Sequence, residues 1–308
     1  MPVSLGPDEA RTFLRARGHE ADDLLRLKGG RWSAAFAFRE GDREYVVRFH
    51  ERRDDLEKDR LAQRWASARL RTPRIVEIGD APPGAYGISE RVRGTPLDEL
   101  DEDGLRRVLP SLLAATDAMR EADLAGTRGY GLWHADGAAI HSSWHDNLVR
   151  EEAPGERAAQ RRLLAASPVG AAEFDAGLAR IRELLPFCPE ARHLVHNDLF
   201  NFNVLVDTEG VVLLDWGASI FGDFVYEVAA LTFWRPWYAT LWGDIDIRAE
   251  VERHWARSGL RVPHFAERLR ACELDIGVGH IAFEASQDET ENASWTARRT
   301  LALATAPL

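Results

Sequence analysis

Four polar side chains between residues 193 and 216 have the types and the order that phosphoryl transfer requires. The stretch HLVHNDLFNFNVLVDTEGVVLLDW contains His196, Asp198, Asn203 and Asp215. Transfer of a phosphoryl group from a nucleotide uses one carboxylate to accept the proton of the attacking hydroxyl. An asparagine and a second carboxylate hold the metal ions that bridge the phosphates. We therefore predict a phosphotransferase that acts on a small molecule.

A β-hairpin predicted directly after Asn203 positions two of these side chains. Residues 204–206 and 211–214 are β-prone apolar runs on either side of a turn at residues 207–210. Pairing of the two runs brings Asn203 and Asp215 to the same end of the hairpin, with Asp198 in the preceding loop. A polar cap on an ordinary hairpin is the alternative interpretation, and four residues in the required order make it the weaker one.

The first 94 residues predict four strands and two helices. β-prone runs flank the turn residues Gly41 and Asp42, and the segments RIVEIGD and AYGISERV form two further strands. Apolar spacing predicts helices over residues 7–17 and 54–70.

From residue 95 the sequence is mainly helical, and we predict two domains, 1–94 and 95–308. Residues 124–147 are predicted to be irregular, and Ser167 and Pro168 are typical of a helix start. The predicted helices of this part are 98–123, 168–185, 223–233, 245–258, 263–285 and 288–304.

The N-terminal part also has residues suited to nucleotide phosphates. Enzymes with this chemistry cover the phosphates with a glycine turn and grip them with a basic residue on the third strand, paired with a helix carboxylate. Gly30 and Ser33 in GGRWS are placed for the turn, and Arg48 in YVVRF fills the strand position. Arginine supplies a permanent charge and bidentate phosphate contacts. Asp59 and Glu57 both remain open as its partner.

The composition of the chain limits the kinds of molecule that it is expected to bind. The chain has 308 residues, and its formal net charge of −11 disfavours nucleic acid and anionic membranes and suits a cationic substrate. Only two cysteines occur, which excludes a disulfide framework. The N-terminal residues do not resemble a signal peptide, and no apolar run reaches membrane-spanning length. We expect a cytoplasmic protein and a monomer.

The sequence lacks the motifs that mark three other kinds of site. The sequence has neither the Walker pattern G-x-x-x-x-G-K-[ST] nor G-x-G-x-x-G, which excludes P-loop and Rossmann sites. His134, His141 and His145 invite a zinc site, but no HExxH or matching carboxylate pattern accompanies them.

The chain resembles the aminoglycoside phosphotransferase family. HNDLFNFNVLVD and LLDWGASIFGDFVYEVA are similar to the two signature blocks of that family, and the resemblance spans residues from about 20 to 285. CPEARHLVH, FGDFVYEVAALTFWRPW and YVVRF are most similar to hygromycin B phosphotransferases. The resemblance implies an α+β, bilobal protein-kinase-like fold, with an antiparallel-sheet N-terminal lobe and a mainly helical C-terminal lobe.

The resemblance also implies roles for single residues. Asp198 would be the catalytic base, Asn203 and Asp215 would bind Mg²⁺, and His196 would organise the loop. The nucleotide would be ATP, with GTP as the alternative, and its base would bind the backbone at Glu90 and Val92. Structural support would come from Asp223 and Glu227, and from Asp59 if it is the partner of Arg48.

The acceptor implied by the resemblance is an aminocyclitol or aminoglycoside, with hygromycin B as the first choice. Such a polycation calls for carboxylates and flat aromatic surfaces. The residues that we predict to contact it are Asp136, Trp144, Asp146, Trp234, Arg235, Trp237 and Tyr238.

Two alternatives remain open at this point. The same fold could act on another alcohol, such as choline, a sugar or a macrolide, because the signature blocks serve only nucleotide and metal. A pseudokinase that binds without transferring phosphate has Arg48 as its only support. The presence of Asp198, Asn203 and Asp215 argues against it.

Overall fold

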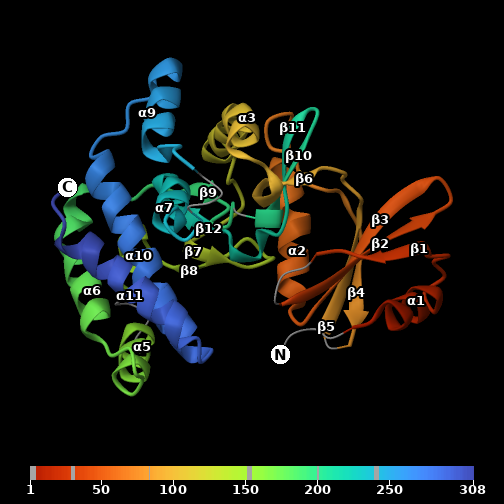
Figure 1. Ribbon diagram of the computed structural model, residues 1–308, viewed down its shortest axis with the longest axis horizontal. Coiled ribbons are helices and arrows are strands. Elements are labelled where there is room, and N and C mark those ends of the chain that lie inside the picture. Colours follow the sequence, from red (N-terminus) through yellow and green to blue (C-terminus); the bar gives the residue numbers. More distant parts are fainter. Residues whose placement is uncertain (1–4, 29–31, 83, 151–154, 200, 239–242) are drawn as a thin grey trace. The chain divides into compact units, whose positions relative to one another are not determined.

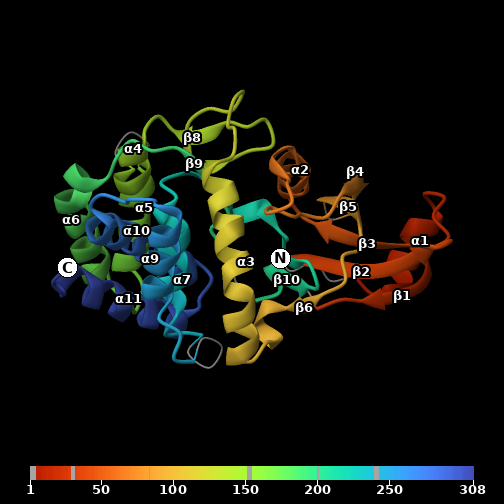
Figure 2. The same ribbon diagram turned by 90° about the horizontal axis from the view of Figure 1, so that it is seen from above.

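The computed structural model describes residues 5–28, 32–82, 84–150, 155–199, 201–238 and 243–308 (Figures 1 and 2). The chain divides into two compact units. Unit 1 comprises Met1–Ala118, His134–Gly137 and Phe200–Ala218, and unit 2 comprises Met119–Trp133, Ala138–Leu199 and Ser219–Leu308. The domain boundary near residue 94 stays a prediction, and unit 1 continues beyond it.

A five-stranded antiparallel sheet with strand order β1-β2-β3-β5-β4 forms the centre of unit 1. Because side chains alternate between the faces of a strand, Phe36, Val47 and Phe49 share one face, where they are buried together with residues of helix α1 (Pro7–Arg15). Arg48 belongs to the opposite face. The strands are β1 (Asp22–Arg26), β2 (Ser33–Glu40), β3 (Arg43–His50), β4 (Ile75–Ala81) and β5 (Gly84–Glu90).

Helix α2 (Arg53–Ala62) contacts β3, β4 and β5 and the short helical turn η5 (Trp216–Ala218). The prediction of one helix over 54–70 is wrong at its C-terminal end. The chain continues as the 3₁₀ turn η1 (Gln63–Trp65) and then leaves the helix. The reason is local, because Ser67 and Leu70 exchange backbone hydrogen bonds of 2.9 and 3.2 Å, and the Ser67 hydroxyl also accepts the Leu70 N–H.

The predicted hairpin is confirmed. Strand β10 (Val204–Asp207) pairs antiparallel with β11 (Gly210–Leu213), and the short strand β6 (Thr95–Pro96) pairs with the other edge of β10. The Leu214 N–H donates to the carbonyl of Asn203 at 2.8 Å. Asn203 and Asp215 therefore lie at the same end of the hairpin.

Unit 2 contains a small four-stranded sheet with strand order β8-β7-β12-β9. The irregular segment predicted over 124–147 is wrong, because it contains two of these strands and a short helix. Strand β7 pairs with β12, which lies far along the chain, and local sequence does not reveal such a pairing. The elements are β7 (Tyr130–Trp133), β8 (Ala139–His141), α4 (Trp144–Val149), β9 (His193–Val195) and β12 (Ile220–Gly222).

The other predicted helices are confirmed to within a few residues except around residue 167, and helix α5 was not predicted at all. Ser167 lies just beyond the end of α5, where its hydroxyl donates to the Leu164 carbonyl at 2.9 Å, and α6 begins only at Ala172. Helices α6, α10 and α11 lie side by side (Figures 1 and 2). The helices are α3 (Glu102–Arg120), α5 (Glu156–Ala165), α6 (Ala172–Leu184), α7 (Val225–Trp234), α9 (Ile247–Ser258), α10 (Phe265–Ser286) and α11 (Thr290–Thr305). Among the described helices, none has the length and apolar character needed to cross a membrane.

Gly94 approaches the backbone of β10 too closely for a side chain. An ideal Cβ on this residue would lie 2.9 Å from the carbonyl oxygen of Val206 and 3.2 Å from the Cβ of Leu205. We expect Gly94→Ala to lower the free energy of unfolding by about 1–3 kcal/mol, as overpacking typically does. Urea titration followed by circular dichroism measures the change.

Gly279 in α10 provides the matched control. Leaving aside the backbone of its own helix, an added Cβ meets no described heavy atom within 4 Å. Gly279→Ala should raise the free energy of unfolding by about 0.5–1 kcal/mol through helix propensity. Equal responses of the two variants would contradict the close approach at Gly94.

Candidate functional site

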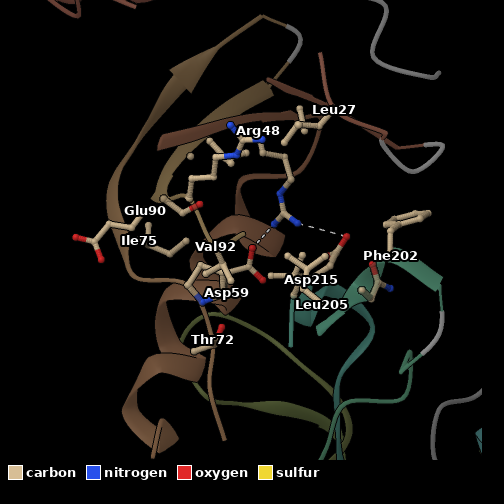
Figure 3. A pocket seen from close by; sticks show the side chains of 18 of the residues that line it. Leu27, Arg48, Asp59, Thr72, Ile75, Glu90, Val92, Phe202, Leu205 and Asp215 are labelled. Carbon is tan, nitrogen blue, oxygen red and sulfur yellow. Dashed lines mark hydrogen bonds and ion pairs between the residues drawn. The ribbon is translucent and has the colours of Figure 1, made fainter. Parts of the chain in front are cut away.

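Unit 1 contains a pocket of about 590 Å³ that brings predicted nucleotide and metal residues together (Figure 3). A volume of this size is ordinary for a small-molecule site. Gly30, the remaining predicted nucleotide residue, lies outside the described residues. The predicted residues that line the pocket are Ser33, Arg48, Asp59, Glu90, Val92, Asn203 and Asp215.

The pocket has apolar walls and a polar floor. Its walls suit a flat heterocyclic base, because apolar side chains exclude water from both faces of such a ring. Figure 3 shows the Arg48 side chain reaching toward Asp59 and Asp215 within this lining. The apolar lining residues are Leu27, Ala35, Val46, Leu56, Pro73, Ile75, Ile78, Val92, Pro96, Phe202, Leu205 and Leu214.

The segment after β5 provides backbone groups at the rim of this pocket. The Glu90 N–H donates to the Arg74 carbonyl at 2.9 Å, and the Arg91 N–H donates to the Glu44 carbonyl at 3.0 Å. For Val92, no hydrogen bond of the backbone occurs among the described residues. Val92 is therefore a position in this segment where a base can bond to the main chain without displacing a bond of the sheet.

Arg48 makes ion pairs with two carboxylates in the pocket. One guanidinium nitrogen binds the Asp59 carboxylate, and the other lies 3.3 Å from Oδ2 of Asp215 (Figure 3). The partner on α2 is thus Asp59, whereas Glu57 pairs with Arg53 and Arg60 of its own helix. Only 16% of the Arg48 side chain and 11% of the Asp59 side chain are exposed, so water screens this pair weakly.

Burial and the neighbouring charges together set the pKa of both members of the pair. Burial raises the pKa of Asp59 to about 6, although the Arg48 guanidinium acts in the opposite direction. Burial by itself lowers the pKa of Arg48, but the charges of Asp59 and Asp215 outweigh it and leave the pKa raised. Arg48 is therefore a permanent cation in this pocket.

Asp215 has a left-handed backbone conformation with φ of 63°. For a residue other than glycine this costs about 1–2 kcal/mol. The Trp216 N–H that follows donates to Oδ1 of Asp59 at 2.8 Å, which holds the backbone in place. The Asp215 side chain is 37% exposed, so its carboxylate is accessible from the pocket.

Asn203 and Asp215 fit the predicted magnesium site by their chemistry. Both line the pocket, and they offer amide and carboxylate oxygens, the hard ligands that Mg²⁺ prefers. In the described part of the chain, no group of three or more His, Cys, Asp and Glu side chains is arranged for a metal. One or two protein oxygens are nevertheless ordinary for Mg²⁺ that is bound together with nucleotide phosphates.

The three histidines considered for zinc have other contacts. His134 lies 3.0 Å from Asp54, His141 lies 2.8 Å from Asp146, and Nε2 of His145 lies 2.7 Å from the Cys188 carbonyl.

The loop with Asp198 belongs to unit 2 and is held by Glu227 of α7. Oε2 of Glu227 accepts the N–H of His196 at 2.6 Å and that of Asn197 at 3.3 Å. His196 is fully buried, and Asn197 has a left-handed φ of 65°. Burial raises the pKa of Glu227 to about 7, against the effect of these two hydrogen bonds. Glu227 thus fixes the backbone immediately before Asp198.

Asp223, predicted to brace the same loop, has different partners. It accepts two hydrogen bonds from the Arg268 guanidinium, at 2.8 and 2.6 Å, and the Val225 N–H at 3.1 Å. It therefore joins the start of α7 to α10. These bonds do not reach residues 196–198, and a supporting role for Asp223 stays a prediction.

Two residues predicted to contact the substrate are buried instead. Trp144 is fully buried, and a Cβ on Gly222 would lie only 2.2 Å from its ring. Asp146 is 6% exposed, and its carboxylate lies 2.8 Å from Nδ1 of His141. Both side chains serve the interior of unit 2, so the prediction of substrate contact is wrong for them. Sequence reasoning missed this because the residues that cover Trp144 come from distant parts of the chain.

The other predicted substrate residues have varied environments. Arg235 donates to the carbonyls of Gly243 and Ile245 at 3.0 and 3.1 Å, which gives it a structural role. Asp136 lies in the segment 134–137 of unit 1, which is anchored where the Ala135 N–H donates to Asp54 at 2.9 Å. Tyr238 is half-buried.

Trp234 and Trp237 form an aromatic cluster with Trp295, which sequence reasoning missed. Trp234 stacks on Trp295 with ring centroids 5.8 Å apart and an interplanar angle of 10°. Trp237 meets the same ring edge-on at 5.0 Å and is 43% exposed. Trp295 lies on α11, in a helix whose sequence pattern is that of an ordinary amphipathic helix. Only the packing of α7 against α10 and α11 reveals it as part of this surface.

These features agree with the comparisons with known proteins. The sequence model of the phosphotransferase enzyme family matches residues 23–263, which is well over half of the chain. The chain therefore belongs to the phosphotransferase enzyme family. Its fold is the mixed α/β, protein-kinase-like fold of aminoglycoside phosphotransferases.

Particular relatives are similar over nearly the whole chain. Hygromycin-B 4-O-kinase of Escherichia coli is 33% identical over 290 residues, which cover 93% of this chain and 82% of that protein. A thermostable mutant of aminoglycoside phosphotransferase APH(4)-Ia, in ternary complex with AMP-PNP and hygromycin B, has a TM-score of 0.84 at 31% identity, over 96% of this chain and 97% of the other. Spectinomycin phosphotransferase APH(9)-Ia shares the fold at 13% identity, with a TM-score of 0.63 over 98% of each chain.

The Arg48–Asp59 pair leads to a test on two neighbouring acids of α2. Asp59→Asn removes the more buried of the two carboxylates that pair with Arg48 and leaves only the more exposed Asp215. The free energy of unfolding should therefore fall by about 3 kcal/mol, the lower end of the range for a broken buried ion pair, and ATP should bind more weakly. Glu57→Gln removes only contacts within α2 and should change stability by less than about 1 kcal/mol. Urea unfolding and calorimetric ATP titration compare the variants. Similar losses in both would refute the specific role of Asp59.

Proposed function

We propose that this protein transfers the γ-phosphoryl group of ATP to a hydroxyl group of hygromycin B, at the 4-position that the name of its relative indicates. The observation that carries the proposal is the similarity to hygromycin-B 4-O-kinase over 93% of this chain. The pocket of unit 1 supports it, because residues suited to a nucleotide and residues suited to a metal line one cavity.

The nucleotide would occupy this pocket with its base between the apolar walls. The Val92 backbone would bond the base, because the Glu90 N–H already donates to the Arg74 carbonyl. Ser33 and Arg48 would bind the phosphates, and Arg48 could do so with the two-pronged geometry of a guanidinium. The AMP-PNP in the APH(4)-Ia complex supports ATP as the donor.

Asn203 and Asp215 would hold Mg²⁺ through their side-chain oxygens. A bound ion would supply positive charge against the negative charge that develops on the phosphates during transfer. Arg48 lies 3.3 Å from Asp215, so the same cation would orient this carboxylate and contact the phosphates. Asp59 would keep Arg48 in place for both tasks.

Asp198 would accept the proton of the substrate hydroxyl. A carboxylate can do this only if its loop is held in the right position, and Glu227 holds the two preceding N–H groups. The left-handed Asn197 turns the chain just before Asp198. His196, fully buried, anchors the start of this turn.

The acceptor is a cationic aminoglycoside, which suits an acidic protein with an exposed aromatic surface. Trp237 and its neighbours Trp234 and Trp295 offer flat π-faces that attract ammonium groups. A formal net charge of −11 adds a long-range attraction for the same ligand. A monomeric state and a cytoplasmic location remain predictions from the sequence.

Loss of Asp198 should separate chemistry from binding. We expect wild-type protein to release ADP with hygromycin B in a coupled assay, and Asp198→Ala to lose nearly all of this activity, by about 100-fold or more. ATP and hygromycin B should still bind to the variant. Kanamycin-type aminoglycosides, choline and a macrolide serve as comparison acceptors. Activity restricted to choline or the macrolide, or full turnover by the variant, would reject the assignment.

The aromatic cluster gives a test of the acceptor site. Trp237→Ala should raise KM for hygromycin B by about tenfold, in line with about 0.5–2 kcal/mol for a cation–π contact, and leave KM for ATP unchanged. Trp144→Ala should instead lower the free energy of unfolding by about 3–5 kcal/mol, because it empties a buried site. Steady-state kinetics and urea unfolding distinguish the two. A raised KM for ATP in the Trp237 variant would argue against an acceptor role.

A further inference from the structure

We propose that Lys58 is a positioning residue that holds Asp215 in its metal-binding conformation through the carbonyl of Gly217. The proposal deepens the function proposed above and rests on it for the assignment of Asp215. Lys58 is one of only two lysines in the chain, and sequence reasoning gave it no role because it lies on α2 and not on the third strand.

Lys58 is buried against the segment that follows Asp215. Its side chain is fully buried, and its Nζ donates to the carbonyl of Gly217 at 2.7 Å. The next residue of α2, Asp59, accepts the N–H of Trp216 at 2.8 Å. Two successive side chains of one helix therefore hold a donor and an acceptor of the two residues after Asp215.

These two hydrogen bonds hold the backbone next to Asp215, which has a strained conformation. Asp215 has φ of 63°, and such a backbone persists only where its surroundings over-determine it. Gly217 also donates weakly to Oδ1 of Asp215, at 3.4 Å, so the position of Gly217 affects the carboxylate directly. Fixing the Gly217 carbonyl thus fixes the direction in which the Asp215 side chain leaves the backbone.

Packing alone does not explain a lysine at this position. A buried ammonium loses its hydration, and an apolar side chain of the same length would fill the space without that cost. The surroundings are acidic, since α2 also carries Asp54, Asp55 and Asp59. Burial lowers the pKa of Lys58 to about 8, so the charged form still prevails at neutral pH. The cation offsets these carboxylates and supplies a hydrogen bond that a methionine lacks.

Without Lys58 the Gly217 carbonyl would lose this donor, and Asp215 could relax toward Arg48, which is already 3.3 Å away. A carboxylate committed to the guanidinium is less available to a metal ion. The effect should therefore appear in the part of nucleotide affinity that depends on Mg²⁺, and not in the affinity for ATP alone. Loss of a residue that orients a metal ligand typically weakens metal affinity by about 10- to 100-fold.

The test measures ATP binding to full-length protein by calorimetry, once with EDTA and once with Mg²⁺. We expect Lys58→Met to bind metal-free ATP like the wild type, and to lose about 10-fold or more of the gain in affinity that Mg²⁺ provides. KM for hygromycin B should not change. Glu57→Gln, on the same helix but paired with Arg53 and Arg60, should keep the wild-type gain.

Each outcome decides the question. A wild-type gain in Lys58→Met, or an equal loss of affinity with and without Mg²⁺, would overturn the positioning role. If Lys58→Met does not fold, Lys58→Gln, which keeps a shorter N–H donor, is measured in the same way and should show a reduced gain. ATP binding is measured without an acceptor. The result can therefore be interpreted even if hygromycin B proves not to be the substrate.

Discussion

The buried ion pair between Arg48 and Asp59 is the interaction on which the nucleotide pocket depends. Arg48 comes from β3, Asp59 from α2, and the second oxygen of Asp59 binds the Trp216 N–H next to Asp215. One carboxylate thus joins a strand, a helix and the metal-binding segment. Because an uncompensated buried charge is costly, these three parts of unit 1 must be in place together or the pair does not form.

Arginine suits this arrangement better than a lysine at the same position would. Its planar guanidinium reaches Asp59 with one nitrogen and Asp215 with another, whereas an ammonium is a single point of charge. The side chain therefore couples the helix carboxylate to the proposed metal ligand directly. Arg48 is thus integrated into the site through both carboxylates. Its presence therefore no longer supports the alternative of a protein that binds nucleotide without transferring phosphate.

A structural feature could be predicted from the sequence when it depended on residues that are adjacent in the chain. The hairpin between Asn203 and Asp215 followed from a few adjacent residues and is confirmed by its register. The pairing of β7 with β12 and the burial of Trp144 arise from contacts between distant segments, which periodicity cannot reveal. The choice of Asp59 over Glu57 required the rotation of α2 against the sheet. Lys58 was overlooked for a related reason, since its partner is a backbone carbonyl that no sequence motif marks.

In each unit, a buried helix carboxylate holds a strained stretch of backbone beside a carboxylate that is proposed to act in transfer. Asn197 and Asp215 are both left-handed residues that are not glycine, and each lies at or beside a carboxylate proposed to act in transfer. In each case a buried helix carboxylate accepts a neighbouring N–H: Glu227 of α7 for the first and Asp59 of α2 for the second. Burial raises the pKa of Glu227 to about 7 and that of Asp59 to about 6. Both supports therefore carry less charge as the pH falls toward 6, while an N–H bond to a carboxyl oxygen persists in either protonation state. A fall in pH toward 6 should thus reduce the charge that stabilises Arg48 more than it disturbs the geometry of the two strained turns.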